Sequence, residues 1–268
     1  MIRVNNKVLK TDVSEKRPGV ENTSDEQFLQ MPFVKHLTDL RRVLVRSIIC
    51  VVVLMLASYP FAREIYAFLS APLAEAFGAG GGRLIFTNLP EVFLTYIKLS
   101  FFSGFMLSFP FIAFQLWSFI SPGLYKDERL FFMGLLFATP VLFFTGAAFV
   151  YYFVLPLAWD FFLSFEVPSM QEGLSMELEA KVNEYLGLTM KLLFAFGFAF
   201  ELPLIMVLLN RAGFVSRQKF AKARRYALVV IFACAAVLTP PDVISQIALA
   251  IPMLLLYEVS LLFMKKSD

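Results

Sequence analysis

Charged residues are scarce in this chain. Only 17% of its 268 residues are Asp, Glu, Lys or Arg, whereas 59% are hydrophobic and the mean hydropathy is +0.71. Soluble domains are about 45–50% apolar, and a soluble surface carrying a share of 32 phenylalanines would aggregate. The composition therefore excludes a soluble globular protein and predicts a membrane protein that crosses the bilayer several times.

Cysteine and histidine are almost absent, which excludes several kinds of site. Cys50 and Cys234 lie in separate apolar runs, so we expect them to act as small hydrophobic residues and not as a disulfide or metal pair. The single histidine, His36, precedes the first apolar run, so neither a His-based metal cluster nor an intramembrane Ser-His pair can form. We expect no metal and no cofactor.

Six apolar stretches predict an all-α protein with six transmembrane helices. A spanning helix needs about 20 apolar residues, and the fifth stretch is shorter, so the bilayer must thin there or neighbouring helices must cover its ends. Four stretches contain a proline, which bends a helix. Bent helices and one short span predict a curved wall with a concave face. The stretches are Val43–Phe61, Val92–Phe119, Leu130–Leu155, Gly187–Leu209, Tyr226–Leu238 and Val243–Phe263.

The distribution of positive charge predicts how the chain is oriented. Between the spans, Lys and Arg number eighteen in the two termini and the alternate loops on one side, and three in the loops on the other. The positive-inside rule places both termini and the basic loops in the cytoplasm. Residues 1–30 are polar and without hydrophobic period, so we expect a disordered cytoplasmic extension before a membrane domain over residues 31–265.

The fourth stretch contains a carboxylate. Glu201 stands about 12 Å from the inner end of the span, and a charge there costs at least about 2.5 kcal/mol on insertion scales. Pro203 follows, removes a helix hydrogen bond and is expected to bend the helix beside the acid. An intramembrane acid indicates a functional site by default. The alternative is that Glu201 is protonated or paired and serves only helix packing.

Few acidic side chains are expected on the inner side, where basic residues dominate. Asp39, before the first span, and Glu128, before the third, are two of them. Carboxylates at two positions can each accept a guanidinium bidentately, which a lysine cannot reproduce. They could therefore distinguish a diarginine ligand from a dilysine one. Two local roles remain open: Asp39 could pair only with Arg42 or Arg46, and Glu128 could cap the third span.

Four motifs stand out along the chain. They are His36-Leu-Thr-Asp-Leu-Arg41, Phe119-Ile-Ser-Pro-Gly-Leu-Tyr-Lys-Asp-Glu128-Arg, Phe198-Ala-Phe-Glu201-Leu-Pro203 and Leu238-Thr-Pro-Pro-Asp242-Val-Ile-Ser-Gln246. These motifs resemble those of the TatC family, the receptor subunit of the twin-arginine protein translocase. They occur in the family's order and the resemblance covers about residues 31–265; the first motif resembles the family pattern H-L-x-E-L-R.

The resemblance implies a receptor and not an enzyme. The receptor would lie in the cytoplasmic (inner) membrane and bind twin-arginine signal peptides of folded proteins for export driven by the proton motive force. It implies signal-peptide contacts in the first two motifs, at His36, Asp39, Arg41, Lys126 and Glu128, and an intramembrane polar site at Glu201. Asp39 replaces the usual Glu and is one methylene shorter. The resemblance further implies docking or assembly of TatA- and TatB-type single-span proteins, and self-association, through Pro203, Thr239, Asp242 and Gln246. Nucleic acid is not an expected partner.

Two other functions, a proton-coupled transporter and an intramembrane hydrolase, are the alternatives for a multi-span chain with a buried acid. A small proton-coupled secondary transporter could use Glu201, but it predicts corresponding features in two repeated halves, and the halves of this chain differ in span length and motif. An intramembrane hydrolase would need a second buried catalytic partner and a motif such as G-x-S-x-G, and neither occurs. The transporter remains the alternative.

Overall fold

The structure of the chain is a computed structural model. It describes residues 23–78, 82–120, 129–166, 178–238 and 243–264, and within these the side chains of residues 23–36, 120, 129–133, 244 and 245 are not described. The chain divides into two units, Met1–Arg42 and Val43–Asp268.

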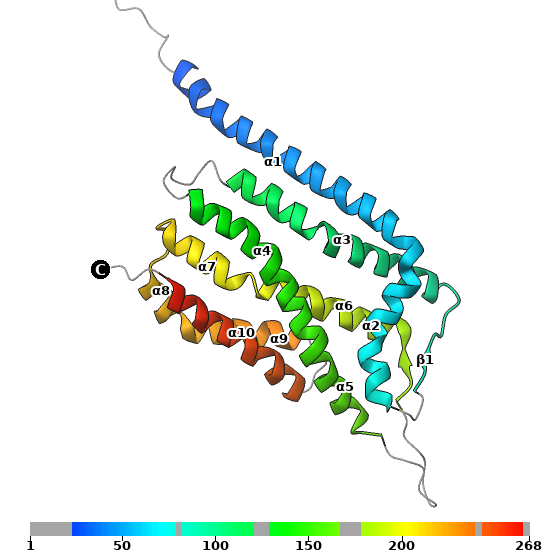
Figure 1. Cartoon of the computed structure of the whole chain (residues 1–268). Helices are drawn as coiled ribbons and strands as arrows, with labels where there is room; N and C mark the ends of the chain where they lie inside the picture. Colours follow the sequence, from blue (N-terminus) through cyan, green and yellow to red (C-terminus); the bar gives the residue numbers. More distant parts are fainter. Residues whose placement is uncertain (1–22, 79–81, 121–128, 167–177, 239–242, 265–268) are drawn as a thin grey trace, which may run out of the picture. The chain divides into compact units, whose positions relative to one another are not determined.

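The described chain is almost entirely helical (Figure 1). Helix α1 begins at Thr23, inside the segment expected to be an extension, and the acidic residues that follow favour a helix N-terminus. The remaining extension, residues 1–22, lies outside the described residues. Bounds of the helices are α1 Thr23–Ser58, η1 Tyr59–Phe61, α2 Ala62–Phe77, α3 Glu91–Ile120, α4 Arg129–Phe149, η5 Val150–Val154, α5 Leu155–Leu163, α6 Val182–Ala199, α7 Leu202–Arg211, α8 Arg217–Lys222, α9 Arg224–Leu238 and α10 Val243–Phe263.

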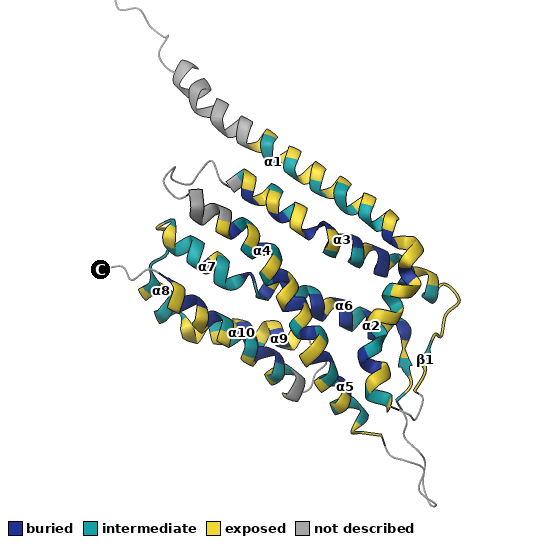
Figure 2. Cartoon of the chain, viewed as in Figure 1, coloured by how far each residue is buried: buried dark blue, intermediate teal, exposed yellow. Residues whose placement is uncertain are grey.

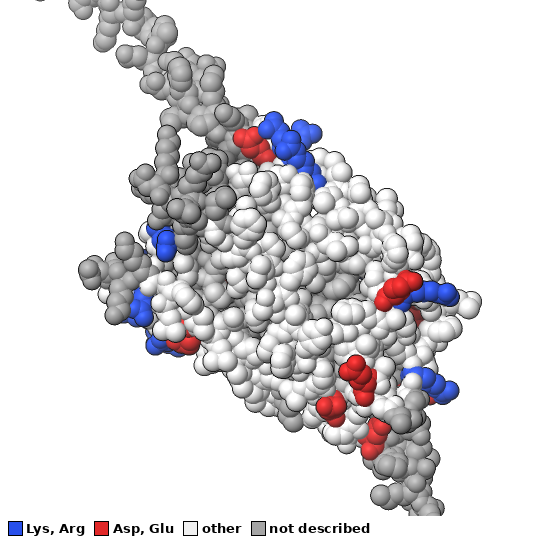
Figure 3. Space-filling model, viewed as in Figure 1, with Lys and Arg blue, Asp and Glu red and all other residues white. Residues whose placement is uncertain are grey.

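Five helical stretches of the described chain are long and apolar enough to cross a membrane. They run over Leu37–Phe77, Glu91–Phe119, Gly134–Leu163, Val182–Arg211 and Gln246–Phe263. Within the unit Val43–Asp268, charged side chains lie toward the edges of the space-filling view, and a broad uncharged surface lies between them (Figure 3). The protein is therefore a multi-pass membrane protein. Helix α9, with 15 residues, is shorter than these stretches, so the sixth crossing, the orientation and the concave wall stay predictions.

The unit Val43–Asp268 is built on contacts between α4 and α6, between α10 and both α7 and α9, and between α2 and both α3 and α5. One apolar core runs through these helices, and α6 contributes many of its buried side chains (Figure 2). A second cluster, centred on Phe109, Trp117 and Phe143, joins α3 to α4. In contrast, most side chains of α1 from Val43 onward are exposed or half-buried.

Two glycines allow helices of this unit to approach closely. A Cβ added at Gly104 in α3 would lie 2.5 Å from the backbone nitrogen of Met55 in α1, and one added at Gly146 in α4 would lie 2.4 Å from the carbonyl oxygen of Phe196 in α6. Small residues commonly allow such backbone contacts between helices in membranes. Any larger side chain at either position would push the two helices apart.

Helix α2 contains Pro72, which has no N–H to donate to the carbonyl of Phe68 one turn earlier. The phenol of Tyr151 donates to that carbonyl oxygen instead, at 2.7 Å, and the phenol of Tyr185 donates to the next carbonyl, of Leu69, also at 2.7 Å. Two side chains from other helices thus satisfy the backbone near the proline. Tyr151 belongs to the π-helical segment η5, a widened turn of the third apolar stretch.

Candidate functional site

The fourth apolar stretch is interrupted at the predicted acid. Helix α6 ends at Ala199 and α7 begins at Leu202, with Glu201 between them. The N–H of Glu201 donates to Phe198 O at 3.1 Å, and the carbonyl of Glu201 accepts from the N–H of Ile205 at 3.0 Å. Pro203 has no N–H to donate to the carbonyl of Ala199, so the regular series of helical backbone hydrogen bonds is interrupted there. The expected disturbance of the helix beside Glu201 is confirmed.

The side chain of Glu201 is buried in the membrane-spanning region. Only 6% of the residue is exposed, and its Oε1 atom has no hydrogen-bond donor among the described residues. An unpaired buried carboxyl oxygen costs about 1–3 kcal/mol even when the group is neutral. Helix packing alone does not require that cost, because a leucine would fill the same space. Glu201 is the strongest candidate for a polar contact inside the membrane.

Aromatic side chains surround the break. Phe198, three residues before Glu201, packs edge-on against Phe109 and Phe143, with ring centroids 6.0 and 5.4 Å apart. Phe198 is nevertheless 49% exposed. This exposed ring, one turn from the buried carboxyl, offers an apolar surface beside a polar group. The combination suits an apolar segment that carries an occasional polar side chain.

Asp39 lies in the other unit, on α1. Its Oδ1 atom is 3.1 Å from Nη1 of Arg42, and the two side chains remain 43% and 58% exposed. Arg41 is exposed as well, and His36 lies on the same helix with its side chain not described. The local pair between Asp39 and Arg42, one of the two roles left open for this acid, is therefore formed. An exposed pair of this kind is worth only about 0–1 kcal/mol, so an incoming guanidinium could replace Arg42.

Four predicted site residues lie outside the described residues. They are Lys126 and Glu128, before α4, and Thr239 and Asp242, between α9 and α10. Helix α4 begins at Arg129, directly after Glu128. The predicted pairing of Asp39 and Glu128 around one ligand therefore stays a prediction.

Gln246 lies in the first turn of α10. Its Nε2 atom donates to the carbonyl oxygen of Phe232 in α9 at 3.1 Å, and the residue is half-buried. The amide thus joins the last two helices, and it is only partly available to a further partner. This contact connects the two helices on which the resemblance puts partner docking.

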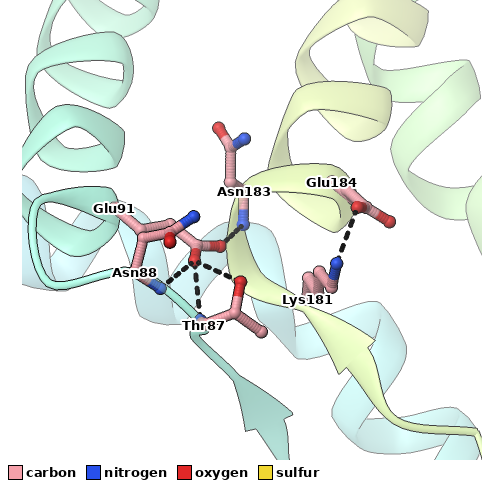
Figure 4. A network of polar contacts seen from close by, with 6 residues as sticks. All are labelled: Thr87, Asn88, Glu91, Lys181, Asn183 and Glu184. Atoms are coloured by element: carbon pink, nitrogen blue, oxygen red, sulfur yellow. Dashed lines mark hydrogen bonds and ion pairs between the residues drawn. The ribbon is translucent and has the colours of Figure 1, made fainter.

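Sequence reasoning missed a polar network at Glu91 (Figure 4). One carboxylate oxygen, Oε2, accepts from the N–H groups of Thr87 and Asn88 at 2.8 and 3.2 Å, and the other, Oε1, accepts from the N–H of Asn183 at 3.4 Å. The signal was present, since Asn88-x-x-Glu91 has the spacing of a capping box. Glu91 thereby connects the start of α3 to the start of α6.

Two further contacts join the same segments. Lys98 Nζ donates to Oδ1 of Asn183 at 2.7 Å, and strands β1 (Leu84–Ile85) and β2 (Ala180–Lys181) pair in parallel. The segment between α2 and α3 is therefore anchored at residues 84–91.

Lys191 was also missed. It is exposed on α6, well inside the fourth apolar stretch. Glu184, Phe198 and Ile205 are exposed at intervals of seven from it, which places all four on one face of the helical stretch. A lysine in this position can extend its stem along apolar surface and carry its ammonium toward the interface.

Comparison with known proteins extends over most of the chain. A family model described as "Sec-independent protein translocase protein (TatC)" matches residues 35–252. The chain is 45% identical over 230 residues to the TatC protein of Rickettsia prowazekii (strain Madrid E), covering 86% of this chain and 91% of the relative. It is 40% identical over 232 residues to the TatC protein of Escherichia coli (strain K12), covering 87% of each.

Solved structures give the same result. A crystal structure of the twin-arginine translocase receptor TatC superposes with a TM-score of 0.74 at 36% identity, covering 85% of this chain and 97% of the other. A second crystal structure of the receptor, in the detergent DDM, superposes with a TM-score of 0.76 at the same identity. The interrupted span with its buried acid therefore belongs to a known kind of membrane protein, and the chain is a member of the TatC family of Sec-independent protein translocase proteins.

Proposed function

We propose that this protein is the receptor and core subunit of a twin-arginine protein translocase. The observation that carries the proposal is the family match over residues 35–252, together with the likeness to a solved twin-arginine translocase receptor. These comparisons support a translocase component over a solute transporter. The polar groups described above supply the recognition chemistry.

Recognition is proposed to begin at carboxylates on the inner side. Among the described residues, Asp39 is held by a single exposed pair, with Arg42, so a signal-peptide arginine can displace Arg42 and form a bidentate contact. Glu128 is proposed to receive the second arginine, with His36, Arg41 and Lys126 as neighbouring contacts. Lysine lacks the planar fork, so a dilysine signal would bind more weakly.

The apolar part of the signal is proposed to lie along the membrane-embedded surface at the exposed ring of Phe198, beside the buried side chain of Glu201. The unpaired Oε1 atom of Glu201 would then receive a donor from the signal or from a partner helix. Single-span partners of the TatA and TatB type would dock at α9 and α10 through Thr239 and Gln246, while Pro203 and Asp242 support assembly. Copies of the receptor would associate in a larger complex.

The proposed setting is the cytoplasmic membrane with both termini in the cytoplasm, because Lys and Arg gather on that side. Transport would draw on the proton motive force. The receptor would bind and position cargo without chemical conversion.

The test is peptide binding in lipid nanodiscs. Matched signal peptides with Arg-Arg or Lys-Lys are titrated against the protein and against Asp39→Ala and Glu128→Ala, with Asp160→Asn, an exposed acid on α5, as the charge-matched control. We expect about a tenfold or greater preference for Arg-Arg, reduced by either variant and kept by the control. Equal binding of both peptides, unchanged in the variants, would contradict the receptor site.

A further inference from the structure

A groove that Glu201 does not line opens on the surface of the unit Val43–Asp268. Its volume is about 750 Å³, and α1, η1, α2, α3, α4, η5 and α6 line it. The floor is made of buried apolar side chains, among them Leu69, Phe102, Ala147 and Leu193. All of the walls belong to stretches apolar enough to cross a membrane.

The rim of the groove is aromatic and aliphatic. Phe61, Phe68, Leu107 and Tyr152 line it and are 56–66% exposed. Tyr152 stands on the π-helical turn, whose neighbouring residue Tyr151 stacks on Phe68 with ring centroids 4.5 Å apart. This contact and the hydrogen bond from Tyr151 to the Phe68 carbonyl fix one wall of the groove.

Water is a poor occupant for such a space. At about 30 Å³ for each molecule, the groove would hold about 25 waters, and each would need two to four polar partners. The lining offers few such polar partners: the Ser103 hydroxyl already donates to Ser100 O at 3.1 Å.

A membrane helix is also a poor fit, because a helix about 10 Å across would fill this volume within a length of about 10 Å. A narrow acyl chain fits the walls.

A charged group lies at one end of the groove. Glu64, in the first turn of α2, lines it, is exposed, and has no hydrogen bond or ion pair with the described residues. Arg63, next to it, is exposed as well. Tyr59 and Phe61, in η1 directly after α1, are exposed, and aromatic residues gather at membrane interfaces. The carboxylate in the lining of the groove complements a headgroup that carries an ammonium.

We propose that this groove binds a phospholipid with a primary-amine headgroup of the ethanolamine type. One acyl chain lies between α1 and α4, and the ammonium donates to the Glu64 carboxylate. Lipid tails are as apolar as the groove, so burial of the tail alone gives no selectivity inside a bilayer. The selectivity must therefore come from Glu64, since phosphate is common to all phospholipids.

The test is native mass spectrometry of the full chain purified in detergent and incubated with phosphatidylethanolamine, phosphatidylcholine or phosphatidylglycerol of equal chain length. We expect the ethanolamine lipid to be retained about fivefold over the other two. Glu64→Gln should abolish that preference, and Asp160→Asn should leave it unchanged. Equal retention of the three lipids, or a preference that survives Glu64→Gln, would overturn the proposal.

A second measurement locates the tail. An ethanolamine lipid with a photoreactive acyl chain should crosslink to peptides that contain Leu107 and Ala148, both of which line the groove. Leu107→Trp and Ala148→Trp fill the groove from exposed positions, so both should reduce the crosslink in protein whose thermal transition is unchanged. Crosslinks elsewhere, or a second copy of the chain or a peptide seated in the groove, would overturn the assignment of a lipid.

Discussion

The phenol of Tyr151 donates a 2.7 Å hydrogen bond to the carbonyl oxygen of Phe68, which Pro72 leaves without its helical donor. The two residues are 83 positions apart in the chain. Proline is thus tolerated inside α2 because another span supplies the missing donor, as membrane proteins commonly arrange. The same contact fixes the wall of the lipid groove.

We expect Tyr151→Phe to lower the free energy of unfolding by about 1–3 kcal/mol, because the Phe68 carbonyl loses its donor while the ring remains. Pro72→Ala restores an N–H that can serve this carbonyl. In the double variant, Tyr151→Phe should therefore cost less than it does alone. Thermal or chemical unfolding of the parent protein, the two single variants and the double variant gives the double-mutant cycle. Equal costs in both backgrounds would show that the hydrogen bond carries no stability.

Gly146 sets the distance between α4 and α6. Gly146→Val should destabilise the protein by about 1–3 kcal/mol, because its Cβ would meet the Phe196 carbonyl at 2.4 Å and separate the helices. Gly134→Ala, on the same helix with open space at its Cβ, is the matched control. It should be neutral or stabilising by up to about 1 kcal/mol. Similar losses from both variants would show that helix propensity and not close approach governs the effect.

Glu201 is expected to lower the stability of the protein and to be needed for export. Glu201→Leu removes an unpaired buried oxygen. The free energy of unfolding should therefore rise by about 1–3 kcal/mol, which thermal unfolding measures. The same change should abolish export of a twin-arginine reporter, while Glu201→Gln should keep partial export because the amide can still form hydrogen bonds. A Glu201→Leu variant with full export would exclude a polar role for this position.

Glu91 should control the order of the segments it connects. In Glu91→Ala, the amides of Thr87, Asn88 and Asn183 lose their common acceptor, so their hydrogen exchange should become faster. Glu184→Ala removes only an exposed pair with Lys181 at 3.6 Å and serves as the control. If the three amides exchange no faster in Glu91→Ala, the β1–β2 pairing alone holds these segments.

The amino-acid sequence alone determined the class of the protein, most of its spans and the interruption at Glu201. These features depend on local properties: apolar length decides what crosses a bilayer, and a proline removes its hydrogen bond wherever it stands. Sequence reasoning did not single out Lys191, because a single lysine in an apolar stretch can extend its stem along apolar surface and belongs to no motif. Nor did it foresee that α1 begins before residue 31.

Only the tertiary structure decided which distant groups meet. Glu91 accepts a hydrogen bond from the backbone N–H of Asn183, and the phenol of Tyr185 donates to the carbonyl of Leu69. Glu64 lines a groove that is walled by α1 and α4 among others. These partners are 92 and 116 residues apart in the first two cases, so no local period or propensity relates them. Their meeting follows from helix packing, in which small residues such as Gly104 and Gly146 let particular helices approach. Local chemistry thus specified the segments, and the packing of the segments specified the contacts.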